Sequence, residues 1–155
     1  MKKFGFILIL LFNTFMGKEV YAQTCWTRVS HHFGIDESLL KAIAWQESRG
    51  KADAIGPPLK GGNIALGIMQ INTIHLPTLK KLGIKKSDLF DPCTNIKIGA
   101  SILADCIRHE GAIWNAVGCY YTGPNSRNAS ARIYYVHSVM RHYQGYRQKF
   151  YVTQR

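Results

Sequence analysis

The spacing of apolar residues along the chain predicts a mainly helical protein. They recur at intervals of three and four residues, which places them on one face of an α-helix. Segments with this spacing cover residues 25–33, 36–49, 70–82, 93–109, 112–121 and 129–145. Asp36 is a predicted N-cap, because its carboxylate can accept hydrogen bonds from the first free backbone N–H groups. Gly34 and Gly111 are predicted helix ends, since glycine follows many helices.

A polar segment at residues 51–65 interrupts the helical pattern. It reads KADAIGPPLKGGNIA and contains three glycines and two prolines. Because both residue types weaken helices, we expect an irregular loop with a short strand pair at most. Residues 146–155 are basic, and we expect them to be frayed. The predicted fold is one mainly α domain, with a glycine-rich loop or short β-hairpin beside the second helix.

One carboxylic acid, Glu47, interrupts the apolar face of the second predicted helix. It falls on the same side as Leu40 and Ile43. An isolated buried carboxylate is strongly unfavourable, so such a group tends to keep its proton near neutral pH, as a general acid must. Glu47 also lies in the last turn before Gly50, where the negative end of the helix dipole raises its pKa further. The alternative is a rim glutamate that caps a surface turn.

The first residues have the pattern of an export signal. Lys2 and Lys3 precede a short apolar run at residues 4–12, and a small-residue site predicts cleavage after Ala22. The apolar run is too short to span a bilayer, so we expect a periplasmic protein with no stable membrane insertion after cleavage. An uncleaved membrane anchor is the alternative. The predicted division is 1–22 as signal peptide, 23–145 as the domain and 146–155 as a basic tail.

The four cysteines indicate two disulfides. In an exported chain an even count is typical of disulfide pairs, and three pairings are possible. We favour a bond between Cys25 and Cys93, which would tie the first helix to the start of a later one. Cys106 and Cys119 would then join two neighbouring helices. No pair has the CxxC spacing and the six histidines do not cluster with the thiols, so we expect neither a metal site nor a cofactor.

The chain is strongly basic, with a formal net charge of +11. The predicted signal carries three lysines and one glutamate, so its removal lowers this charge by two. A positive balance favours an anionic partner, and the carboxylates of cell-wall peptides would fit. Nucleic acid is not expected, because the basic residues are scattered and no nucleic-acid-binding motif accompanies them.

Four short segments together carry a family resemblance. They are AWQES with DAIG at residues 44–48 and 53–56, GIMQIN at 67–72, FDPCTNIKIG at 90–99 and WNAVGCYYTG at 114–123. In this order and spacing they resemble the small lytic transglycosylases of the lysozyme-like superfamily. The likeness covers residues 25–143 and is greatest to the stand-alone periplasmic enzymes that accompany type III secretion, type IV secretion and conjugation systems.

The resemblance implies a lysozyme-like single domain and assigns roles to particular residues. It implies that Glu47 is the catalytic acid and base. Residues implied to contact the glycan or to shape its cleft are Ser48, Gly67, Ile68, Met69, Gln70, Tyr120 and Tyr135. Core packing is the alternative for Met69 and Tyr120, and a satisfied interior amide is the alternative for Gln70.

Two departures from the family pattern bear on mechanism. Tyr121 stands where the family usually has asparagine, which puts one polar contact in doubt. Ala65 stands where some relatives have aspartate, so no second catalytic carboxylate occupies that position. Asp53 is the remaining acid in the loop near Glu47, and we give it no direct role.

The missing carboxylate favours a reaction in which the substrate supplies its own nucleophile. Glycoside hydrolysis usually needs two carboxyl groups. With one, the C6 hydroxyl of N-acetylmuramic acid (MurNAc) can attack its own C1, which cleaves the β-1,4 bond to N-acetylglucosamine (GlcNAc) and forms a 1,6-anhydro ring. We therefore expect a monomeric peptidoglycan lytic transglycosylase that opens the wall for a secretion or conjugation apparatus. The alternatives are a hydrolytic muramidase and a non-catalytic peptidoglycan-binding assembly protein.

Overall fold

The computed structural model describes residues 24–153, so the predicted signal peptide at 1–22 lies outside the described residues. A first helix covers residues 24–33. The further helices and strands are α2 (Glu37–Ser48), β1 (Ala65–Leu66), β2 (Ile71–Asn72), α3 (Leu76–Lys81), α4 (Pro92–Glu110), α5 (Ile113–Thr122) and α6 (Ala129–Thr153). Short 3-10 turns cover Lys60–Gly62, Thr73–His75 and Lys86–Phe90. The predicted mainly α fold with a short hairpin is confirmed.

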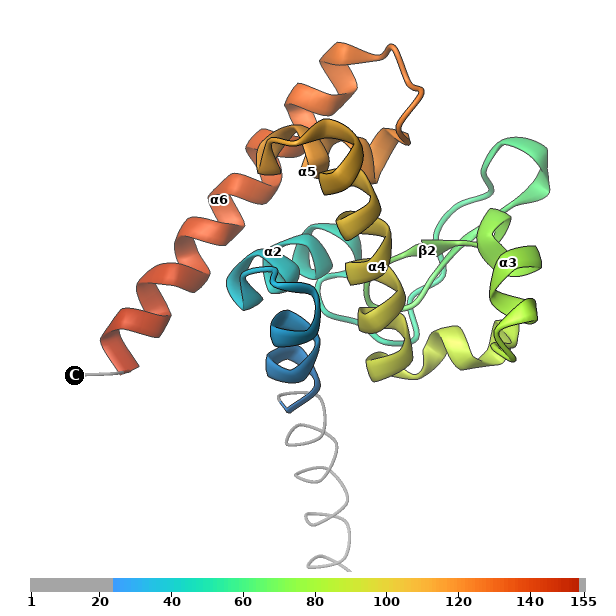
Figure 1. Ribbon diagram of the computed structural model, residues 1–155, viewed down its shortest axis with the longest axis horizontal. Coiled ribbons are helices and arrows are strands. Elements are labelled where there is room, and N and C mark those ends of the chain that lie inside the picture. The colour runs from blue at the N-terminus through green and yellow to red at the C-terminus, as the bar shows by residue number, and fades with distance from the viewer. Residues whose placement is uncertain (1–23, 154–155) are drawn as a thin grey trace, which may run out of the picture.

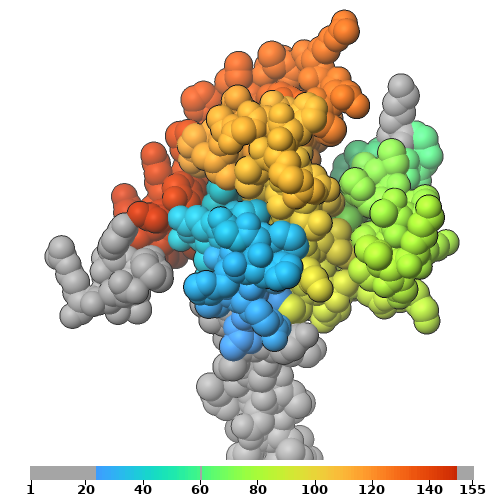
Figure 2. All heavy atoms as spheres, in the orientation of Figure 1, coloured from blue at the N-terminus to red at the C-terminus, as the bar shows by residue number. Residues whose placement is uncertain are grey.

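Helix α4 runs through the middle of the molecule (Figure 1). On one side of it, α2 packs against α6, and α5 packs against both α4 and α6. The hairpin and α3 lie on the other side of α4. Figure 2 shows the green segment that contains α3 standing out beside the central yellow helix.

Two aspartates start α2 and α4, the helices that contribute the largest shares of the buried hydrophobic residues. Asp36 accepts a hydrogen bond from the backbone N–H of Ser38 at 2.7 Å, which confirms it as the N-cap of α2. Asp91 accepts one from the N–H of Thr94 at 2.8 Å and caps α4, with Pro92 in the first turn. The apolar faces of both helices are buried in one hydrophobic core.

Two disulfides join the helices in the favoured pairing. Cys25 is bonded to Cys93 with a Cα–Cα distance of 5.6 Å, which ties the first helix to the start of α4. Cys106 is bonded to Cys119 at 5.8 Å and joins α4 to α5. Each stabilises the fold by about 2–4 kcal/mol, mainly by restricting the unfolded chain.

The predicted helix over residues 70–82 is wrong in its first half. β1 and β2 pair antiparallel, with Ala65 opposite Asn72 and Leu66 opposite Ile71. Gln70, just before β2, has a φ of 49°, a left-handed conformation that a continuing α-helix does not accommodate. The α-helical part of the segment is therefore limited to α3.

Helix α6 extends beyond its predicted end near Gly145. It continues to Thr153, so the expected fraying of residues 146–153 is wrong. Arg147 pairs with the cap residue Asp36 at 3.2 Å, and the hydroxyl of Tyr143 donates to the same carboxylate at 2.9 Å. These contacts hold the part of α6 around Tyr143 and Arg147 against the start of α2. No helix within residues 24–153 is long and apolar enough to cross a membrane.

Candidate active site

Glu47 lies in the last turn of α2, where the chain leaves the helix. The helix ends at Ser48, and Arg49 follows in the left-handed conformation with a φ of 57°. The N–H of Arg49 donates to the carbonyl oxygens of Ala44 and Trp45, and the helix ends one residue before its predicted end at residue 49. Glu47 thus stays on the side of α2 that faces the core and α6.

The carboxyl of Glu47 has an unusually high proton affinity. Burial raises its pKa from 4.5 to about 7, while a hydrogen bond from the Tyr135 hydroxyl to Oε1 acts in the opposite direction. Among the described residues no carboxylate contributes to this shift. Burial is therefore the dominant cause, and Glu47 remains largely protonated in mildly acidic conditions.

Two buried tyrosine hydroxyls accompany the carboxyl. Tyr135, on α6, is 3% exposed, and burial followed by the charge of Glu47 raises its pKa well above the ordinary value. Burial and then the charge of Glu47 also raise the pKa of Tyr120, whose hydroxyl donates to the carbonyl of Met69 at 2.8 Å. Both phenols therefore remain protonated donors at physiological pH.

The turn between β1 and β2 is bonded to the helices around it. Ser48 donates to the carbonyl of Ile68 at 2.7 Å, which fixes the turn to the end of α2. Asn95 of α4 is completely buried and accepts from the N–H of Met69 at 2.8 Å. Its amide nitrogen donates to the carbonyls of Leu66 at 2.9 Å and Leu89 at 2.7 Å. Helices α2, α4 and α5 thus all hold the same turn.

Three residues of the GIMQ segment shape the turn from within. Gly67 has a φ of 77°, and a Cβ there would lie 2.2 Å from the side-chain nitrogen of Asn95. Met69 is fully buried, with its sulfur against Gly99. Gln70 donates its side-chain amide to the carbonyls of Gly67 at 2.9 Å and Ala54 at 3.3 Å. Core packing for Met69 and a satisfied amide for Gln70 are both observed.

The structure gathers the predicted site residues around Glu47, but their contact with substrate stays a prediction. Ser48, Tyr120 and Tyr135 are joined by hydrogen bonds either to the turn or to Glu47 itself. Asp53 is exposed in the loop after α2. Asn95 was missed by the sequence analysis. The pattern that could have identified it is the one that identified Glu47, because Asn95 is a polar residue next to Ile96 on the buried face of a helix.

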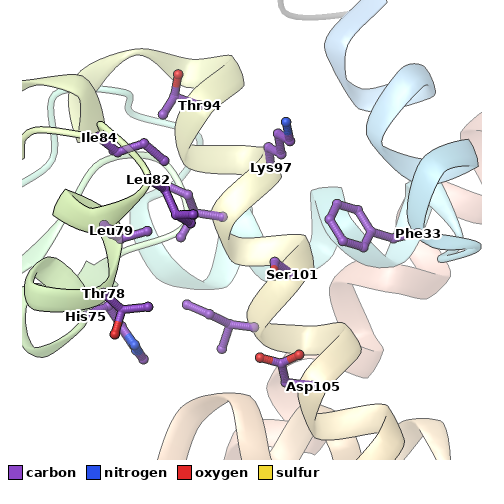
Figure 3. A pocket seen from close by; sticks show the side chains of 12 residues that line it. Phe33, His75, Thr78, Leu79, Leu82, Ile84, Thr94, Lys97, Ser101 and Asp105 are labelled. Atoms are coloured by element: carbon purple, nitrogen blue, oxygen red, sulfur yellow. The ribbon is translucent and has the colours of Figure 1, made fainter.

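A cavity of about 660 Å³ lies elsewhere, between α3 and α4 (Figure 3). It is lined by Phe33, His75, Thr78, Leu79, Leu82, Ile84, Thr94, Lys97, Ile98, Ser101, Ile102 and Asp105. None of the predicted site residues lines this cavity, so it is separate from the candidate active site. Within residues 24–153 no group of three or more histidine, cysteine, aspartate or glutamate side chains is placed to hold a metal ion.

Comparison with known proteins gives one family. A model described as "Transglycosylase SLT domain" matches residues 24–144. Invasion protein IagB of Salmonella typhimurium is 41% identical over 120 residues, which are 77% of this chain and 74% of that protein. A peptidoglycan-binding-like protein of Escherichia coli O157:H7 is 38% identical over 145 residues, covering 88% of this chain and 87% of that one.

A solved structure has the same fold. It is an inactive Glu-to-Gln mutant of lytic transglycosylase Slt from Pseudomonas aeruginosa, with a TM-score of 0.65 and 25% identity. The match covers 83% of this chain and 24% of the Slt chain, so this protein corresponds to about a quarter of Slt. The lysozyme-like fold expected from the sequence is therefore confirmed.

Proposed function

This chain belongs to the family of transglycosylase SLT domains, and we propose from that premise that it cleaves peptidoglycan with a single catalytic carboxyl, that of Glu47. The observation that carries the proposal is the pKa of Glu47, which burial raises to about 7 with no carboxylate contributing among the described residues. Such a group can donate a proton near neutral pH and can take it back within the same reaction. In Slt, an inactive mutant has glutamate replaced by glutamine.

In the first step Glu47 acts as an acid. Tyr135 donates to Oε1 of Glu47, so the proton of the neutral carboxyl is carried by Oε2. Oε2 donates this proton to the glycosidic oxygen between C1 of MurNAc and C4 of GlcNAc, and the C1–O bond breaks. General acid catalysis of this kind accelerates a reaction by about 10²- to 10⁴-fold. The ionised carboxylate that remains is stabilised by the Tyr135 hydroxyl.

In the second step the substrate closes upon itself. The C6 hydroxyl oxygen of MurNAc bonds to C1, and its proton passes to the carboxylate of Glu47, which restores the acid. The N-acetyl group stabilises the positive charge at C1, and no water is consumed. A well-oriented internal nucleophile has an effective concentration that can exceed about 10⁵ M, so it can compete with water. No second protein carboxylate is needed.

The turn at Gly67 to Gln70 forms one wall of the proposed glycan site. The hydroxyls of Ser48 and Tyr120 donate hydrogen bonds to carbonyl oxygens of the turn, and these bonds make the wall rigid before substrate binds. Gly67 and Met69 are buried, so they act through the backbone and by packing, whereas Gln70 is partly exposed and is the member we propose to meet the sugar.

We further propose that the protein is exported by residues 1–22, works as a monomer in the periplasm and opens the wall locally for a secretion or conjugation apparatus. The basic charge of the chain suits a wall rich in carboxylates. A relative 41% identical to this chain is named an invasion protein, which is consistent with such a role. Deletion of the gene should impair assembly of the apparatus encoded beside it, measured by secretion or plasmid transfer.

The test of the reaction is mass spectrometry of the fragments released from purified peptidoglycan. The parent protein should release fragments with 1,6-anhydro-MurNAc ends, and Glu47→Gln should release none. Glu37→Gln is a matched control, because Glu37 lies on the same helix but pairs with Lys41 at 2.6 Å, away from the site; it should retain activity. Reducing MurNAc ends would identify a hydrolytic muramidase. Binding to peptidoglycan with no release by the parent protein would identify a non-catalytic binding protein.

A further inference from the structure

Tyr121 forms an exposed aromatic surface beside the candidate active site. It lies near the end of α5, and its ring stacks on that of Tyr135 with the centroids 4.6 Å apart and the planes within 5° of parallel. Tyr135 is 3% exposed, whereas Tyr121 is 56% exposed. One face of the Tyr121 ring is therefore covered by Tyr135, and most of its accessible surface lies on the other side.

The stack holds Tyr121 in a fixed orientation relative to Glu47. Tyr135 is anchored from the opposite end, because its hydroxyl donates to Oε1 of Glu47. A ring supported in this way loses little conformational freedom when a ligand binds to its free face. One ring and one hydrogen bond thus link Tyr121 to Glu47, so Tyr121 lies close to the carboxyl that we propose as the catalytic acid.

A flat aromatic face packs more favourably against a sugar ring than against water. A pyranose ring has one face made largely of C–H groups, which packs well against an aromatic ring, and the phenol can bond a neighbouring hydroxyl or acetamido group. The stack on Tyr135 buries less than half of the Tyr121 surface, so this side chain adds little stability to the fold by burial. The Tyr121 side chain can therefore contribute more to ligand binding than to the stability of the core.

We propose that Tyr121 is a specificity-determining residue whose free face stacks on a sugar of the glycan strand next to the bond that Glu47 cleaves. This inference rests on the proposed function, because it names the contact made by the substrate of the same site. In this chain the tyrosine replaces the asparagine expected from the family resemblance, so an apolar stacking contact takes the place of a polar one.

The experiment measures glycan binding without turnover. In a Glu47→Gln background, calorimetry gives the Kd for an N-acetylglucosamine hexasaccharide and for uncrosslinked glycan strands. Tyr121→Phe keeps the flat face and should bind within about twofold of the parent, whereas Tyr121→Leu covers Tyr135 without a flat face and should bind about three- to tenfold more weakly. Tyr134→Leu is the matched control, because Tyr134 is 73% exposed on α6, and it should bind like the parent.

A second measurement separates stacking from a structural role. With Glu47 restored, the pH midpoint of activity should be the same in Tyr121→Leu and Tyr121→Phe, because both keep an apolar group over Tyr135. Equal affinity of the Leu and Phe variants for glycan, or an equal loss in Tyr134→Leu, would overturn the role of Tyr121 while the proposed function stands. If the Glu47→Gln protein with an intact Tyr121 binds neither glycan, the proposed function and this inference both fail.

Discussion

The turn at residues 67–70 and the carboxyl of Glu47 are neighbours in the candidate active site, and they differ in how their polar groups are satisfied. The turn forms hydrogen bonds with side chains of three helices, those of Ser48, Asn95 and Tyr120. Glu47 receives a hydrogen bond from Tyr135, yet burial still raises its pKa to about 7. The turn gains rigidity from its polar groups, whereas Glu47 is held where its charged form is unfavourable.

This difference predicts opposite responses to mutation. Removing a bond from the turn should destabilise the protein, because buried backbone groups are left without partners. Removing the charge of Glu47 should stabilise the protein and abolish its activity, because the group is placed for chemistry at a cost to the fold.

The largest effect is expected at Gly67. Gly67→Ala combines a φ of 77° with a Cβ only 2.2 Å from Asn95 and from the carbonyl of Leu89, so we expect a loss of at least about 4 kcal/mol in unfolding free energy. Gly83→Ala is the matched control: its φ is 76°, but no atom lies within 4 Å of the added Cβ. It should lose only about 1–2 kcal/mol. Equal losses of unfolding free energy in urea denaturation would show that the loss comes from backbone strain and not from the close contacts with Asn95 and Leu89.

A smaller but still large effect is expected at Asn95. Asn95→Ala leaves the N–H of Met69 and the carbonyls of Leu66 and Leu89 without their partner, so stability should fall by roughly 3 kcal/mol or more. Asn115→Ala, at an exposed position on α5, should change stability by no more than about 0.5 kcal/mol. A loss below about 1 kcal/mol for Asn95→Ala would mean that the turn does not depend on this side chain.

Glu47→Gln should increase the stability of the protein, in contrast to the two substitutions above. A shift of the folded-state pKa from 4.5 to about 7 corresponds to about 3 kcal/mol. Because the folded pKa is raised, the penalty is absent below the unfolded pKa, grows between the two values and is complete above about pH 7. Glutamine removes it and still accepts from Tyr135, so the melting temperature should rise by several degrees at about pH 8 and little at about pH 4. A melting temperature lowered equally at both pH values would contradict the comparison.

Much of the fold was predictable from local signals. Apolar spacing located α2 and α4, and Asp36 was predictable as the cap of α2, since a helix depends on residues close together in the sequence. The sequence left three disulfide pairings open, and the pairing that we favoured is confirmed. The continuation of α6 past Gly145 was not predictable from its own sequence, because Arg147 is held there by Asp36, 111 positions away.

The candidate site was predictable only in part. Glu47 was recognisable as an acid on an apolar face, and in the structure burial is the first cause that raises its pKa. Its contact with Tyr135 joins residues 88 positions apart, which no local pattern encodes. The apolar spacing predicted a helix at Gln70, because spacing carries no information about a left-handed backbone conformation. In the structure the Gln70 side chain donates hydrogen bonds to the carbonyls of Gly67 and Ala54.

The most direct test of the central claim is a titration of the Glu47 carboxyl itself. Carboxyl-carbon NMR of the labelled protein follows each glutamate with pH, and the resonance missing from Glu47→Gln identifies Glu47. We predict a midpoint at about 7, together with a loss of wall-lytic activity as the pH rises through the same range. A midpoint at the ordinary glutamate value of about 4.3 would show that Glu47 is a carboxylate under working conditions and would contradict its role as the proton donor.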